Sequence, residues 1–302
     1  MDGTRPLMLG LVGDSASGKT TLVRGVVRLL GHNGVTPICL DDYHRYSRPE
    51  LASRGLTAAD PEANDLSLMA EHLAALRAGG TIRKPVYDHR SGTLRGPETV
   101  AATGLVVAYG MLTLTPAALA DLFDLTVYLE PDEALRRAWR LERDVRERGY
   151  TPQEVLALRA ARERDAARFI AVQRPRAAAI VRFHGAPDGA PGGLAVELTL
   201  RRGQGAQPLA PALDALASAA LPGLALSREV SDEDGHLADR LTIEPAVGAA
   251  AAHAAALITD GLVGPRPVAL DALGQVRGPA GVWHSPPLAL TQLLIVRRLI
   301  AP

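Results

Sequence analysis

Short apolar runs alternate with stretches of helical spacing between residues 7 and 160 of the chain. Runs short enough for buried strands occupy 7–12, 36–40, 104–109 and 124–130, and each is followed by glycine, proline or acidic residues. Helical spacing predicts helices over 21–30, 66–76, 116–122 and 132–148, and a capping-box pattern at 151–154 starts another. Residues 81–99 are typical of a hairpin. The alternation predicts an α/β fold with a mostly parallel sheet covered by helices on both faces.

A segment rich in glycine, proline and alanine interrupts this pattern at 185–193. Beyond it, the pattern predicts strands over 194–201 and 237–243 and helices over 247–258 and 288–300. We therefore expect a core over 1–184, a linker over 185–193, and a small C-terminal α+β segment over 194–302 packed on that core.

Composition narrows the classes of partner. Lys plus Arg and Asp plus Glu number 33 each, so no net charge favours nucleic acid or an anionic membrane surface as a partner. The apolar runs are broken by polar and small residues and the N-terminus has no signal pattern, so we expect a cytoplasmic protein. The single cysteine, Cys39, excludes an internal disulfide and a cysteine-rich metal site.

The stretch GDSASGKTT matches the phosphate-binding pattern G-x-x-x-x-G-K-[ST] between a predicted strand and a predicted helix. Its glycines let the backbone amides and the helix N-terminus face a polyphosphate, Lys19 is suited to the β- and γ-phosphates, and the Thr20 hydroxyl is suited to Mg²⁺. The sequence thus predicts a P-loop core that binds ATP and Mg²⁺, and the loop by itself leaves open a hydrolase, a nucleotide switch or a P-loop kinase of a small molecule. The nucleotide-binding residues are Gly13, Asp14, Ser15, Ala16, Ser17, Gly18, Lys19, Thr20 and Thr21.

The stretch LDDYHRYSRPE places two acids at the end of the second predicted strand, where ligands of parallel sheets bind. A carboxylate there can accept a proton from an attacking hydroxyl, while His44 and Arg48 can hold an anionic group of the acceptor. This combination favours a phosphorylated sugar as acceptor. The alternative is a turn with solvated charges.

Several segments in order, LDDYH, DPEAND (60–65), KPVYDHRSG (84–92), FDLTVYLEPDEALRRAWRLERDVRERGYT (123–151) and ADRLTIEP, resemble the phosphoribulokinase family. The wider relatives, uridine kinase and pantothenate kinase, are less similar over 84–92 and 143–149. The resemblance implies ATP-dependent phosphorylation of ribulose 5-phosphate to ribulose 1,5-bisphosphate.

The resemblance also implies roles for individual residues. Asp41 is expected to be the general base and, with Thr20, a metal ligand, and Lys19, Arg143 and Asp144 are expected to be catalytic. Contacts to the sugar phosphate are expected from His44, Arg48, Tyr87, His89 and Arg148. Two arginines near the end of one helix can hold the transferring phosphoryl group and the substrate phosphate. The alternative for 143–148 is a solvated helix face with spaced ion pairs.

The chain departs from the family at two places. Tyr109 stands where the family has a glutamate before glycine, and Leu112 stands where it has a histidine. A phenol is neutral at pH 7, so either Asp42 supports the metal in place of the glutamate or the chain is an impaired paralogue. Plant-type relatives pair a cysteine of the phosphate loop with one before the catalytic acid, and here Ser17 replaces the first while Cys39 keeps the second.

Three further functional expectations follow from the sequence. The alternatives to ribulose 5-phosphate kinase are a regulatory paralogue that binds ATP and a sugar phosphate, and a uridine- or pantothenate-type kinase. A nucleotide-dependent switch is disfavoured, because the arginines on the acceptor side would have no role in it. We expect a homo-oligomer, with a dimer favoured. The acidic turn over 231–239 is interpreted as a solvated loop because its acids lack the spacing of a calcium loop.

Overall fold

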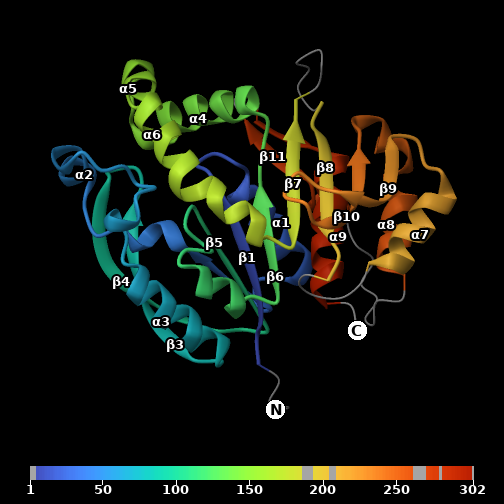
Figure 1. Cartoon of the computed structure of the whole chain (residues 1–302), viewed down its shortest axis with the longest axis horizontal. Coiled ribbons are helices and arrows are strands. Elements are labelled where there is room, and N and C mark those ends of the chain that lie inside the picture. Colours follow the sequence, from blue (N-terminus) through green and yellow to red (C-terminus); the bar gives the residue numbers. More distant parts are fainter. Residues whose placement is uncertain (1–4, 186–192, 204–208, 261–269, 279–280, 301–302) are drawn as a thin grey trace.

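One eight-stranded sheet forms the centre of the molecule (Figure 1). The structure is a computed structural model that describes residues 5–185, 193–203, 209–260, 270–278 and 281–300. The first five strands in sheet order are parallel and the last three are antiparallel, which confirms the predicted α/β class. In sheet order they are β2 (Val35–Cys39), β5 (Leu105–Gly110), β1 (Leu7–Gly13), β6 (Leu125–Leu129), β7 (Ala179–His184), β8 (Ala195–Arg201), β10 (Leu237–Ile243) and β9 (Leu224–Ser231).

Helices cover the sheet, and two hairpins lie outside it. None of the described helices is long and apolar enough to cross a membrane. The hairpins are β3 (Thr81–Asp88) with β4 (Thr93–Ala101), and β11 (Gln275–Gly278) with β12 (Gly281–His284). The α-helices are α1 (Lys19–Leu30), α2 (Arg48–Arg54), α3 (Leu66–Arg77), α4 (Glu133–Arg148), α5 (Pro152–Ala157), α6 (Arg159–Asp165), α7 (Ala210–Ala219), α8 (Ala251–Thr259) and α9 (Pro286–Ile300).

Most predicted elements form, with some differences. The segment predicted as a helix at 116–122 is a 3-10 turn, Ala117–Leu122, which follows Pro116 and has only six residues. The pattern does not predict the strands β7, β9, β11 and β12 or the helices α2 and α7. Of these, β7 has only three consecutive apolar residues, Ala179–Val181, before Arg182, and the half-buried positions of β9 include Arg228, so both apolar signals are short.

Alternate residues of the parallel strands enter two hydrophobic clusters on opposite faces of the sheet. Leu9 and Leu11 of β1 pack on one face, and Met8 and Val12 pack on the other. The first face is covered by α1 and by α7 to α9, while the second is covered by α3 and short turns. This burial on both faces explains why the strands read as nearly continuous apolar runs.

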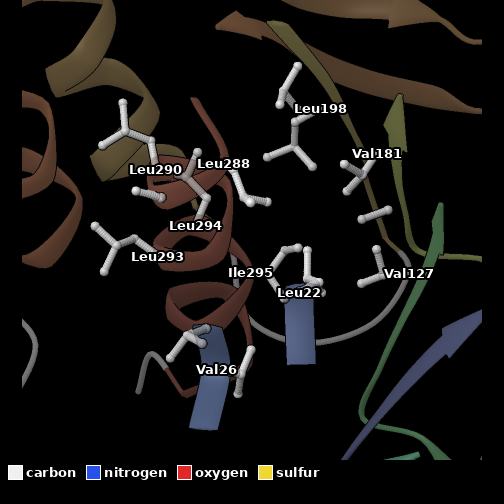
Figure 2. Packing of buried hydrophobic residues seen from close by; sticks show 14 of the residues in the cluster. Leu22, Val26, Val127, Val181, Leu198, Leu288, Leu290, Leu293, Leu294 and Ile295 are labelled. Atoms are coloured by element: carbon white, nitrogen blue, oxygen red, sulfur yellow. The ribbon is translucent and has the colours of Figure 1, made fainter. Parts of the chain in front are cut away.

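The helix α9 packs beside α1 on the same face of the sheet (Figure 2). A Cβ at Gly25 of α1 would lie 2.0 Å from the Gln292 side chain of α9, so the absence of a side chain allows this close approach. The Gln292 amide donates to the Thr21 carbonyl of α1 and accepts from the Gly274 amide. The C-terminal helix therefore supports the helix that follows the phosphate loop. The labelled side chains in Figure 2 are Leu22, Val26, Val127, Val181, Leu198, Leu288, Leu290, Leu293, Leu294 and Ile295.

The sheet continues across the expected domain boundary. Residues 186–192 of the expected linker lie outside the described residues. On its two sides, β7 and β8 pair in register from Ala179 with Leu200 to His184 with Ala195. The division into 1–184, 185–193 and 194–302 stays a prediction, and the strands of 194–302 extend the sheet of the core.

The acidic turn between β9 and β10 is not a solvated loop, so that interpretation was wrong. Arg201 is 1% exposed and donates through Nε to Asp232 Oδ2 at 2.6 Å, and it also pairs with Asp234. Arg174 binds Glu233 and Asp234 of the same turn. The charges of the turn are matched by arginines far away in the sequence, which no local spacing reveals.

Candidate active site

The phosphate loop connects β1 to α1 and closes tightly on itself. A Cβ at Gly13 would lie 2.6 Å from the Leu129 carbonyl oxygen, and Gly18 has a φ of 92°, so both positions favour glycine. Ala16 also has a positive φ of 65°. Lys19 Nζ donates to the carbonyls of Gly13 at 2.7 Å and of Asp14 at 2.8 Å. The lysine thus lies within the loop, from which it can turn to a bound phosphate.

Asp41 lies just beyond β2, in a 3-10 turn over Leu40–Tyr43. Its Oδ1 accepts a hydrogen bond of 2.8 Å from the Met111 amide, and a Cβ at Gly110 would lie 3.0 Å from the same oxygen. Burial alone would raise the pKa of Asp41, but the Lys19 charge and the Met111 amide hold that pKa below its ordinary value. Asp41 is therefore ionised at neutral pH, as a proton acceptor must be.

The helix α4 is joined to the phosphate loop by two arginines. Arg143 donates to Ser15 Oγ at 2.9 Å, and Arg136 pairs with Asp14 at 2.5 Å. In Figure 1, α4 crosses the end of the sheet next to α5 and α6. Its last turns are therefore held beside the loop.

Asp144 is the centre of an arginine cluster at the end of α4. Its carboxylate is 1% exposed and has four cationic partners, Arg140, Arg143, Arg148 and Arg162, between 2.6 and 3.8 Å away. Burial would raise the pKa of Asp144, but these arginines, Arg143 first, hold it below its ordinary value. The geometry gives Asp144 the task of gathering cations that would otherwise repel one another.

The acceptor-side residues form a packed group around the β3–β4 hairpin. His44 Nδ1 lies 2.7 Å from Asn64 Oδ1, and the Tyr87 ring makes edge contacts with the rings of His44 and His89. Burial, with the Arg148 charge nearby, lowers the pKa of His89 to about 4, so this ring is neutral at pH 7.

Arg48 links this group to the end of α4. It donates to the carbonyls of His89 at 2.8 Å and of Arg148 at 3.3 Å, and it stacks on the Tyr150 ring at 4.3 Å. Its guanidinium thus already has partners in the hairpin and at the end of α4.

A cavity of about 810 Å³ joins these parts into one site. Its lining includes the phosphate loop together with Asp41, His89 and Arg148, and the part formed by these three residues is called here the acceptor end. Of the five predicted substrate residues, His89 and Arg148 are in the described lining, while His44, Arg48 and Tyr87 pack outside it and stay predictions. The apolar part of the lining, called here the base end, is formed by Trp139, Phe183, Leu194, Val276, Val282 and Leu288, with Arg277.

Two oxygen donors in the cavity fit Mg²⁺, while one oxygen of the nearby Asp42 is paired with Lys84. The exposed Thr20 hydroxyl and the second Asp41 oxygen have the hard oxygen chemistry that Mg²⁺ prefers. Asp42 forms a buried ion pair with Lys84; burial would lower the pKa of Lys84, but this hydrogen bond raises it. Tyr109 lies opposite Cys39 in the parallel register of β2 and β5, and burial raises the pKa of its phenol. It therefore adds no negative charge to the metal region.

A model of the Phosphoribulokinase / Uridine kinase family matches residues 8–188. The chain belongs to this family. It is 38% identical to a phosphoribulokinase of Synechocystis over 177 residues, which cover 59% of this chain and 53% of that relative. It is 36% identical to a uridine kinase of Deinococcus deserti over 155 residues, 50% of this chain and 75% of that relative. The chain thus spans about half the length of the curated phosphoribulokinase that it matches.

A solved structure shares the wider architecture. A phosphoribulokinase from Rhodobacter spheroides superposes with a TM-score of 0.63 over 86% of this chain and 96% of that chain, at 17% identity. At 17% identity, this similarity shows that the two proteins share a fold and no more. Because the aligned part exceeds residues 8–188, it includes strands or helices of the C-terminal segment.

Sequence reasoning missed the base end of the cavity. Val276 and Val282 come from the β11–β12 hairpin, far from the phosphate loop in sequence and beyond the family match. Their short strands carry no motif, and only the packing of the C-terminal segment on α1 brings them to the site. A signal was present in Trp139, an aromatic residue on an otherwise highly charged helix.

Replacing Val282 with Asp should weaken ATP binding about tenfold. Val282 is 58% exposed at the base end, and a carboxylate there would oppose the burial of a base and repel the phosphates. Titration with a fluorescent ATP analogue measures the Kd. The control is Leu237→Asp in β10. Leu237 is also an apolar residue of a strand and is 52% exposed, but it lies outside the cavity lining. Equal Kd values for the two variants would contradict this assignment.

Proposed function

We propose that the protein transfers the γ-phosphoryl group of ATP to ribulose 5-phosphate, giving ribulose 1,5-bisphosphate and ADP. The observation that supports this most strongly is the single cavity, in which the phosphate loop leads directly to an ionised carboxylate and to an arginine. Asp41 accepts the proton of the attacking hydroxyl. At the same time the hydroxyl oxygen of the substrate bonds to the γ-phosphorus, and the bond between that phosphorus and the ADP oxygen breaks.

The remaining residues position and neutralise charge. Lys19 leaves its loop carbonyls to meet the β- and γ-phosphates, and Arg143, held beside Ser15, faces the phosphoryl group in transfer. Thr20 and Asp41 are the residues that would hold Mg²⁺, which supplies neutralisation of phosphate charge when bound.

The acceptor end favours an anionic sugar. Arg148 and the neutral donor His89 line this end, and an arginine suits a phosphate better than the uncharged ribose of uridine. The phosphoribulokinase matches also cover more of the chain than the uridine kinase matches, 59% against 50%. The second candidate, an impaired paralogue that binds both ligands in a regulatory role, is supported by Tyr109, which leaves the metal region with less negative charge than a glutamate would. Cytoplasmic location and a homodimer stay predictions from the sequence.

A coupled ADP-release assay with ribulose 5-phosphate, uridine and pantothenate tests the acceptor. We expect release to be stimulated by ribulose 5-phosphate alone, because its phosphate gives Arg148 a doubly charged, bidentate partner, whereas uridine is uncharged and pantothenate carries a single carboxylate. Stimulation by uridine or pantothenate alone would overturn the proposed acceptor. Binding of ATP and ribulose 5-phosphate without ADP release would favour the regulatory paralogue.

Replacement of Asp41 by Asn should lower kcat by about 10²–10⁴-fold, because the amide cannot take the proton. The Kd for ATP should stay nearly constant, since the phosphates are expected to be held by Lys19 and the phosphate loop, which the substitution leaves in place. Steady-state kinetics and nucleotide titration are measured on the same preparation. Glu71→Gln, at an exposed position of α3, is the control and should leave both values unchanged. Normal turnover in Asp41→Asn would show that Asp41 is not the general base.

Replacement of Tyr109 by Glu should increase kcat and lower the Mg²⁺ concentration needed for half-maximal activity. A carboxylate between β1 and β2 would lie where the phosphoryl charge redistributes and would help to balance the metal. The change also removes a partly buried ring, so unfolding in urea is measured alongside as a control. A slower but equally stable variant would show that the site works around the tyrosine.

A further inference from the structure

Three side chains of different chemistry converge at the acceptor end of the cavity. The Cys39 sulfur, a carboxylate oxygen of Asp42 and a ring nitrogen of His89 all lie within 4.8 Å of one another. All three residues line the cavity, so the group is reachable by a small ion. We propose that Cys39, Asp42 and His89 form a binding site for a thiophilic divalent cation of the Zn²⁺ type, distinct from the Mg²⁺ of the phosphate loop, and that its occupation blocks the acceptor.

The separations suit a small tetrahedral ion after modest movement. Ligand atoms bound to Zn²⁺ at about 2.0–2.3 Å are separated from one another by about 3.3–3.8 Å in a tetrahedron. His89 Nε2 and Asp42 Oδ1 are 4.0 Å apart, close to this range. The most widely separated ligand atoms must come closer by about 1 Å. Small side-chain rotations can supply this movement, because His89 lies just beyond the end of β3, outside any strand.

Lys84 takes one oxygen of Asp42 and leaves the other within reach of a metal ion. Lys84 binds Oδ2, while Oδ1 lies 4.0 Å from His89 Nε2 and accepts from the Tyr87 amide at 3.3 Å. Lys84 also pairs with Glu98 at 3.1 Å, so it retains an anionic partner if Asp42 turns to a cation. The thiol proton of Cys39 leaves to solvent as the sulfur–metal bond forms, so the thiolate cancels one unit of the ion's charge, the metal stays divalent and no redox partner is needed.

The donor set separates this site from one for Mg²⁺. Sulfur and imidazole nitrogen favour Zn²⁺ and its neighbours in the first transition row, while Mg²⁺ favours oxygen alone. Tyr109, the register neighbour of Cys39, contributes a neutral phenol and no second carboxylate. Three protein ligands leave a fourth position open to water or to a substrate oxygen.

Occupation of the site has a functional consequence that rests on the proposed function. Asp42 directly follows Asp41, and His89 shares the acceptor end with Arg148. A cation here occupies the space of the sugar phosphate and leaves the base end and the phosphate loop open. Inhibition should therefore be competitive with ribulose 5-phosphate and not with ATP.

The test uses Co²⁺ as a probe on the full chain in the presence of excess Mg²⁺. A cobalt–thiolate bond gives charge-transfer absorption in the near ultraviolet, which does not require kinase activity. We expect one equivalent of Co²⁺ to produce this absorption. It should be lost in Cys39→Ser, and the Kd for Co²⁺ should rise at least tenfold in His89→Gln. His253→Gln, at an exposed position of α8, is the matched control and should bind like the unaltered protein.

The outcomes separate this inference from the proposed function. Charge-transfer absorption that persists in Cys39→Ser, an unchanged Kd in His89→Gln, or absence of cobalt binding to the unaltered protein would each overturn the site. Cobalt that binds without competing with ribulose 5-phosphate would overturn the blockade of the acceptor. A protein freed of transition metals and assayed with Mg²⁺ that shows no kinase activity toward ribulose 5-phosphate would count against the proposed function alone, since the cobalt spectrum is read without any substrate.

Discussion

The candidate site depends on the parallel pairing of β5 with β1 on one side and with β2 on the other. This pairing brings the carboxyl ends of three strands to one edge, where parallel sheets bind their ligands. It places the phosphate loop after β1 and Asp41 after β2 on either side of Gly110. The Met111 amide can then hold the Asp41 carboxylate, and the absence of a side chain at Gly110 leaves room for it.

Electrostatics in the site are local, because the chain has no net charge. Burial of Lys19 lowers its pKa while the nearby carboxylates of Asp41 and Asp14 oppose that effect, so lysine and base stabilise each other's charged forms. Asp144 has a comparable task on α4, where one buried carboxylate holds several arginines near the cavity. Cationic groups that would otherwise repel one another are thereby held beside the phosphate loop.

The segment beyond the family match completes this arrangement. Gln292 of α9 binds the first turn of α1, and the β11–β12 hairpin supplies the valines of the base end. The phosphate loop and the C-terminal segment thus meet on a single helix, α1. Binding of the base and of the phosphates is expected to depend on the packing of that segment.

The sequence alone determined the features that short stretches encode: the phosphate loop, the α/β alternation, the acid after β2 and the family. Each of these rests on contiguous residues whose geometry follows from local backbone preferences and burial. The tertiary structure decided the rest: Cys39 beside Tyr109, Lys84 on Asp42, Asp144 among its arginines, and Val282 at the cavity. These contacts join residues that are far apart in the chain or on different elements, so strand register and helix packing set them, and no local spacing in the sequence carries that information.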